Sequence, residues 1–99
     1  MHIKDVKIPS TWTPLSQYLD VEAGVEYLII NSSPDTIYAI ESTGAPAAGY
    51  IGVPVEPTCY IDYKKGNQDL YIRNGYTPVT AGGVAKENKL SNITINKVG

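Results

Sequence analysis

Short runs of apolar residues dominate this chain, and each run ends at a glycine, a proline or a cluster of turn-forming residues. The 7 prolines and 9 glycines leave no long stretch with the i, i+3, i+4 apolar spacing of an amphipathic helix. The best helical candidate is about one turn over 14–19, with Thr13 as its cap and Pro14 at its first position. The pattern therefore predicts an almost entirely β protein.

The strongest strand signals lie in two pairs of runs, 26–31 with 36–42 and 58–63 with 70–73. A turn cluster joins the first pair, and a polar connector containing Gly66-Asn67 joins the second, so we expect two antiparallel hairpins. In the second pair, parity places Cys59, Ile61, Tyr63, Leu70 and Ile72 on the core side, and Tyr60, Asp62, Tyr71 and Arg73 on the other side.

The remaining pattern completes a small antiparallel β-sandwich or barrel. Neither face of 36–42 is fully polar, which predicts either a central strand or a sheet covered on both sides. Residues 43–57 predict a long loop with a short edge strand near 50–53. Ile93 and Ile95 should face inward from a short strand, and Val6 and Ile8 should form a matching edge strand.

Length and charge fit one folded domain. The chain has 99 residues, 42% of them hydrophobic and 18% charged, and a net charge of −2. We expect residues 1–23 to form an extended N-terminal arm with the short helical turn, and residues 24–99 to form the β domain. No apolar run approaches the roughly 18 residues of a membrane helix, and no basic face suits nucleic acid, so we expect neither partner.

Residues for catalysis are scarce. The only histidine is His2 and the only cysteine is Cys59, whereas nucleophilic catalysis needs a base beside the nucleophile. The acidic residues are scattered and form no pair that suits hydrolysis of a glycosidic bond. We therefore expect no enzyme, no cofactor and no metal site, and we interpret Cys59 as a small buried hydrophobe.

The aromatic residues favour a contact surface, because the chain has 8 tyrosines, 1 tryptophan and no phenylalanine. Tyrosine suits a half-buried surface, because its ring packs against apolar groups while its hydroxyl contacts water, and it is enriched at interfaces. It is also an ordinary strand residue. The candidate contact residues are Trp12, Tyr18, Tyr50 and Tyr76. Trp12 would serve equally well as a cap on the core. Since many small domains gain stability by association, we also expect a homo-oligomer.

The order of segments over about residues 12–74 resembles that of small tailed-bacteriophage virion proteins with β-sandwich folds. The resemblance rests on Trp12-Thr13-Pro14-Leu15, 24–33, 37–40, Ala45-Pro46, Gly52-Val53-Pro54-Val55 and 69–74. It implies a capsid decoration (cement) protein located in the virion, with the major capsid protein or other virion proteins as partners, and no catalytic residues. The alternatives are a tail or fibre component, or a carbohydrate- or receptor-binding module whose exposed aromatic residues stack on sugars.

Overall fold

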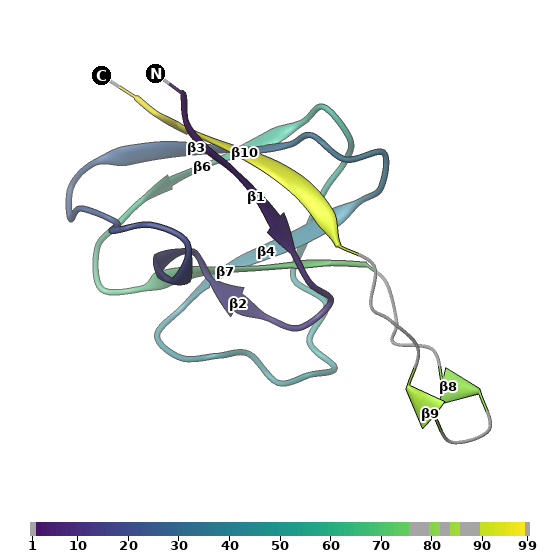
Figure 1. The fold of residues 1–99 in the computed structure, drawn as a ribbon. Coiled ribbons are helices and arrows are strands. Elements are labelled where there is room, and N and C mark those ends of the chain that lie inside the picture. Colours follow the sequence, from purple (N-terminus) through teal and green to yellow (C-terminus); the bar gives the residue numbers. More distant parts are fainter. Residues whose placement is uncertain (1, 76–79, 82–83, 86–89, 99) are drawn as a thin grey trace.

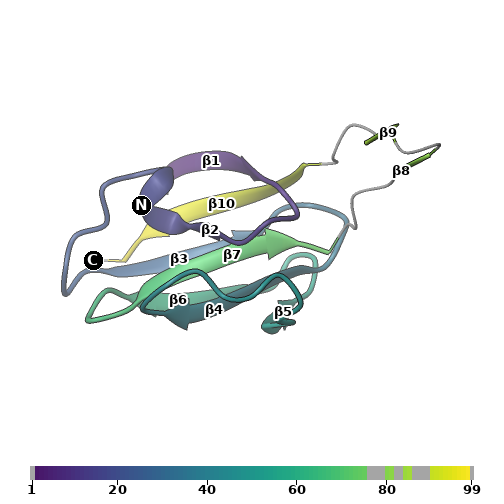
Figure 2. The same ribbon diagram turned by 90° about the horizontal axis from the view of Figure 1, so that it is seen from below.

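Two four-stranded antiparallel sheets lie face to face in the computed structural model, which describes residues 2–75, 80–81, 84–85 and 90–98 (Figure 1, Figure 2). The first sheet has the order β1 (His2–Ile8), β10 (Ser91–Lys97), β3 (Glu26–Asn31) and β6 (Tyr60–Lys64). The second has the order β2 (Thr13–Pro14), β7 (Asp69–Asn74), β4 (Ile37–Ser42) and β5 (Val53–Val55). The prediction of a small antiparallel β-sandwich is confirmed.

Two short elements complete the description. Strands β8 (Thr80–Ala81) and β9 (Val84–Ala85) pair with each other and with neither large sheet. The 3₁₀ turn η1 (Leu15–Gln17) follows β2. Among the residues that the structure describes, no helix has the length and apolar character needed to cross a membrane.

The core lies between the two sheets and is built by alternate residues of nearly every long strand. Buried side chains come from β1, β10, β3 and β6 on one side, and from β4, β5 and β7 on the other; they are Val6, Ile8, Tyr27, Ile29, Tyr63, Ile93, Ile95, Ile37, Ala39, Val55, Leu70 and Ile72. Full burial of one such aliphatic side chain contributes about 1.5–3 kcal/mol. The inward positions of Ile93 and Ile95 and the edge strand containing Val6 and Ile8 are confirmed.

Both predicted hairpins are wrong, because the chain changes sheet at these connections. Strand β3 pairs with β10 and β6, whereas β4, which follows it, pairs with β7 and β5. Likewise β6 lies in the first sheet and β7 in the second. Each of these short connectors is long enough to cross the ~10 Å between packed sheets. The alternating pattern puts the same side chains in the core for either topology, so it could not tell them apart.

The crossing from β3 to β4 is held by Asn31, whose side chain is fully buried. Its Nδ2 donates to the backbone oxygens of Asp35 (2.6 Å) and Val55 (2.8 Å), and its Oδ1 accepts from the backbone N–H (2.9 Å) and the hydroxyl (2.7 Å) of Ser33. Val55 belongs to β5 of the opposite sheet. The Asn-Ser-Ser-Pro-Asp cluster therefore forms a turn, but one that ties the two sheets together.

Cys59 is exposed, so its predicted place in the core is wrong. It lies before the first residue of β6, which is an edge strand, and next to Thr58, whose φ is +69°. Thr58 N donates to the backbone oxygen of Asn31, and Asn31 N donates to the backbone oxygen of Cys59. Thr58 and Cys59 together therefore lie opposite the single residue Asn31, which is a β-bulge. Tyr71, expected to lie on the side away from the core, is buried as well.

The N-terminal segment lies along both sheets of the sandwich. Strand β1 pairs with β10, β2 pairs with β7, and Leu15 of η1 is buried in the core. The short helical turn is thus present, but Thr13 does not cap it: its hydroxyl donates to the oxygen of Thr11, and Pro14 occupies the cap position without a side-chain bond. The described residues of the expected arm are therefore packed against this chain's own sheets.

The phenol of Tyr63 makes the fold sensitive to alkali. Burial, helped by the negative charges of Asp69 and Glu41, raises its pKa above the usual 10.0, against a weaker opposing backbone hydrogen bond. Because the folded state holds the proton more tightly, the stability that this group contributes is fully present below pH 10.0 and falls as pH rises through the higher folded pKa.

We expect thermal unfolding followed by circular dichroism to show a lower Tm above about pH 10 than at about pH 8. In Tyr63→Phe, which also loses the 2.6 Å bond to the oxygen of Gln68, this fall should be smaller. An equal fall in both proteins would contradict the assignment.

Candidate functional site

The outer face of the second sheet carries a stacked cluster of three side chains from neighbouring strands. Tyr38 of β4 and Arg73 of β7 lie opposite each other, and Trp12 immediately precedes β2. The guanidinium carbon of Arg73 lies 4.4 Å from the ring centroid of Tyr38 and 5.0 Å from that of Trp12. Arg73 is thus held between two aromatic rings, an arrangement in which a cation is attracted by both.

Arg73 also fastens the loop 43–52 onto this face. Its Nη2 donates to the backbone oxygen of Ile51 at 2.9 Å, and its Nη1 donates to that of Asn74 at 3.0 Å. These are charge-assisted hydrogen bonds, which are stronger than neutral ones. The loop therefore has a defined place over the sheet although it has little regular structure of its own.

Gly52 allows the loop to approach Trp12. Its φ is +81°, and a Cβ atom at this position would lie 2.6 Å from Cη2 of Trp12. Both the left-handed backbone and the lack of space require glycine here. The Tyr50 ring lies on the same part of the loop, with its centroid 6.3 Å from that of Trp12 and the planes tilted by 47°.

The loop ends in an exposed apolar surface, which we call the loop patch and define as Trp12, Tyr50 and Ile51. Tyr50 is 49% exposed and Ile51 is 67% exposed, whereas Trp12 beneath them is half-buried. Scattered exposed apolar residues are ordinary on a protein surface. These differ because they are adjacent, they extend an aromatic cluster, and Arg73 holds the loop that carries them.

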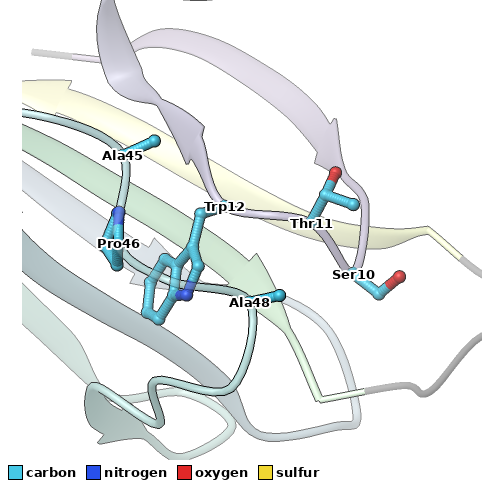
Figure 3. A pocket seen from close by; sticks show the side chains of 6 residues that line it. All are labelled: Ser10, Thr11, Trp12, Ala45, Pro46 and Ala48. Carbon is cyan, nitrogen blue, oxygen red and sulfur yellow. The ribbon is translucent and has the colours of Figure 1, made fainter.

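A cavity of about 360 Å³ lies beside the loop patch. Figure 3 shows Trp12 between the β1–β2 connection, which supplies Ser10 and Thr11, and the loop, which supplies Ala45, Pro46 and Ala48. The indole Nε1 of Trp12 and the hydroxyl of Ser10 are buried without a hydrogen-bond partner among the described residues. The cavity is mostly apolar, and these two polar atoms are buried beside it.

The structure brings together two of the four predicted contact residues. Trp12 and Tyr50 adjoin, as described above, whereas Tyr18 is half-buried against the core. Burial raises the pKa of the Tyr18 phenol, and its hydrogen bond with Thr13 opposes this. Tyr76 lies outside the described residues. Within the described ranges there is no group of three or more His, Cys, Asp or Glu that could hold a metal ion.

Sequence reasoning missed Arg73, Ile51 and Gly52. Arg73 was expected to point away from the core, which is correct, but nothing in the strand pattern shows that two rings from other segments enclose it. The signal for Gly52 was available, since a glycine between two apolar residues of an edge segment often marks a close approach. Only the fold shows that it approaches Trp12.

Replacing Arg73 with leucine should loosen the loop 43–52. The change removes two charge-assisted hydrogen bonds and the stacking of a cation on both rings, so we expect a stability loss of about 2–3 kcal/mol. Because Trp12 is the only tryptophan, its fluorescence reports on this site directly, and its emission should shift to the red. In Arg73→Lys, which keeps the charge but not the planar fork, the loss should be smaller. Unchanged emission in Arg73→Leu would show that Arg73 does not hold the loop.

Comparison of the chain with protein-family models, with curated proteins and with solved structures found no match.

Proposed function

We propose that this chain is a non-enzymatic structural protein of a bacteriophage particle, a capsid decoration protein that binds the assembled shell through the loop patch. The observation that carries the proposal is the exposed apolar pair Tyr50 and Ile51 at the end of a loop that Arg73 and Trp12 hold in place. The resemblance of the segment order to that of small virion β-sandwich proteins suggests which kind of partner the patch meets.

The loop patch suits binding to a large, fixed partner. A loop that is already ordered loses little conformational freedom on binding, so less of the contact energy is spent on ordering it. Aromatic side chains flanked by apolar ones are frequent anchors at protein interfaces. A shell presents many copies of one surface, and a small domain with an exposed apolar patch fits that task without a catalytic cleft.

The proposal is tested by mixing the purified chain with particles stripped of it and measuring the bound fraction by co-sedimentation. Ile51→Asp places a charge in the middle of the loop patch, and we expect it to weaken shell binding at least about tenfold, the loss that 1.4 kcal/mol produces. Leu90→Asp is the matched control, because Leu90 is also exposed, at 54%, but lies just before β10 of the first sheet. Equal binding by the two variants would show that the loop patch is not the contact.

The second candidate function is a carbohydrate- or receptor-binding module, which the cavity beside Trp12 favours. An apolar cavity with an aromatic wall and a few polar atoms is the usual form of a small-ligand site. Titration of the chain with a panel of glycans, followed by Trp12 fluorescence, tests this directly. A saturable spectral change together with no shell binding would replace the decoration function by this one. No change over the panel would remove the candidate.

A further inference from the structure

The four edges of the two large sheets differ in how open they are to another strand. In the second sheet, β2 has two residues and β5 has three, and each contains a proline, which has no N–H to donate. In the first sheet, β1 has an irregular register between His2 and Lys4. The remaining edge, β6, has five residues in regular register with β3 and contains neither proline nor glycine. A regular edge strand with all its N–H groups is a template for strand addition.

The outward backbone groups of β6 are identified by the bonds at its two ends. The oxygens of Cys59 and Lys65 accept from N–H groups of Asn31 and Gly24, so the odd-numbered residues face β3. Successive residues of an antiparallel strand alternate between the two sides. The backbone N–H and C=O groups of Tyr60, Asp62 and Lys64 therefore point out of the free edge.

An apolar groove lies beside this edge, between β6 and the strands of the second sheet. It has a volume of about 230 Å³, and its apolar lining includes Val53, Ile61 and Leu70. Val53 is 51% exposed although it belongs to β5, a strand of the second sheet. A strand added to β6 would extend the first sheet over the groove and cover both Ile61 and Val53.

The charges along β6 are complementary to those of a second copy of the same strand. Asp62 lies in the middle of β6, Lys64 is its last residue, and Lys65 follows it. In the part of the chain that the structure describes, neither Asp62 nor Lys64 forms an ion pair, whereas Lys65 lies 3.5 Å from Asp69.

The charges also select one register of such a pair. An antiparallel pair of β6 strands related by a two-fold axis at Tyr63 places each Asp62 opposite the Lys64 of the other copy. Two neighbouring registers are reached when one strand slides by two residues relative to the other. In one of them each Asp62 lies opposite the Asp62 of the other copy, and in the other each Lys64 lies opposite the Lys64 of the other copy. Like charges in directly opposed positions are destabilising, so the register centred on Tyr63 is favoured over both neighbours.

We propose that two copies of this chain pair through their β6 edges, antiparallel and with Asp62 opposite Lys64, which joins their first sheets into one continuous eight-stranded sheet. A two-fold interface uses the same surface on both subunits, so both ion pairs and both grooves are completed at once. The pairing is independent of the shell binding proposed above, since the loop patch lies over the outer face of the second sheet.

Charge reversal tests the pairing. We expect wild-type chain to sediment as a concentration-dependent dimer, and Asp62→Lys and Lys64→Asp each to weaken the dimer at least about tenfold, because each variant sets like charges opposite each other. An equimolar mixture of the two variants should form a heterodimer, since every lysine at these two positions then faces an aspartate of the other copy. Lys7→Asp, on the edge strand β1, is the matched control and should leave the dimer unchanged. Circular dichroism of each variant shows whether it is folded.

Spin labels on the native Cys59, which is exposed, test the register. With the axis at Tyr63, the two Cys59 positions are offset by about eight residues, or about 27 Å along the strands at about 3.4 Å per residue. The registers one step to either side would give offsets of about 20 Å and about 34 Å by the same rise per residue, and either would overturn the proposed one.

Three further outcomes would overturn the proposal. The first is a wild-type chain that remains monomeric up to about 1 mM, the weak end of specific association. The second is a dimer that neither charge reversal affects. The third is a monomeric chain whose β6 variants lose shell binding, which would assign the edge to an extended segment of a shell protein. Ile51→Asp should leave the dimer intact, so failure of the dimer and failure of shell binding are separately observable.

Discussion

Asn31→Leu is expected to destabilise the protein by about 3 kcal/mol or more, because several buried polar groups lose their partner at once. The leucine has a similar size, but it leaves the Val55 oxygen and the Ser33 N–H without the partner that Asn31 supplies, while the Ser33 hydroxyl and the Asp35 oxygen keep their bond to each other. Each buried polar group that loses its hydrogen bond costs about 1–3 kcal/mol. Since a domain of this kind has a total stability of about 5–15 kcal/mol, a substantial part of the molecules would unfold at moderate temperature.

Urea unfolding followed by circular dichroism measures this loss. Asn67→Leu is the matched control, because Asn67 lies exposed in the connection between β6 and β7, and its replacement should change the stability by less than about 0.5 kcal/mol. A loss below about 1 kcal/mol in Asn31→Leu would mean that water replaces the lost bonds, and Asn31 would then not hold the crossing between the sheets.

Deleting residues 1–8 is expected to abolish cooperative folding or to lower stability by about 3–6 kcal/mol, the contribution of two buried aliphatic side chains. The deletion removes Val6 and Ile8 from the core, exposes the edge of β10, and leaves Asn74 Nδ2 without the oxygen of Ile8, to which it donates at 3.1 Å. A free arm would behave in the opposite way, because its removal would leave the sandwich intact.

A synthetic peptide of residues 1–10 provides a control for the effect of the deletion. Added in excess to the shortened chain, the peptide should restore the native circular dichroism spectrum by supplying β1 as a separate strand. Lys7→Ser, which changes an exposed side chain and keeps the strand, should unfold at nearly the wild-type temperature. A shortened chain with the Tm of the full chain would show that β1 contributes nothing to stability.

The sequence allowed the fold class and most core positions to be predicted, because alternation along a strand depends only on local residue types. Ile93 and Ile95 show this, since their inward positions follow from one short polar–apolar pattern. The pairing of strands could not be predicted in the same way. Two strands show the same alternation of polar and apolar residues whether they pair within one sheet or face each other from opposite sheets. The hydrogen bond that ties the sheets together, from Asn31 to Val55, joins residues 24 positions apart in the sequence.

The candidate site was only partly predictable for a similar reason. Trp12 and Tyr50 stand out as residue types that anchor interfaces, but their proximity depends on β2 and the loop 43–52 meeting over the same sheet. Arg73 is an ordinary charged residue of a strand until the fold brings the rings of Trp12 and Tyr38 close to its guanidinium group. Such a stack joins three separate segments, and no local pattern encodes it.

The most direct test of the proposed function is the copy number of this chain in purified phage particles, measured by quantitative mass spectrometry against the major capsid protein. The decoration function predicts a copy number close to that of the major capsid subunits, with loss from the particle in Ile51→Asp but not in Leu90→Asp. A count of only a few to a dozen copies would contradict decoration and move the chain to the neck, tail or fibre. Complete absence from particles would contradict the virion function itself.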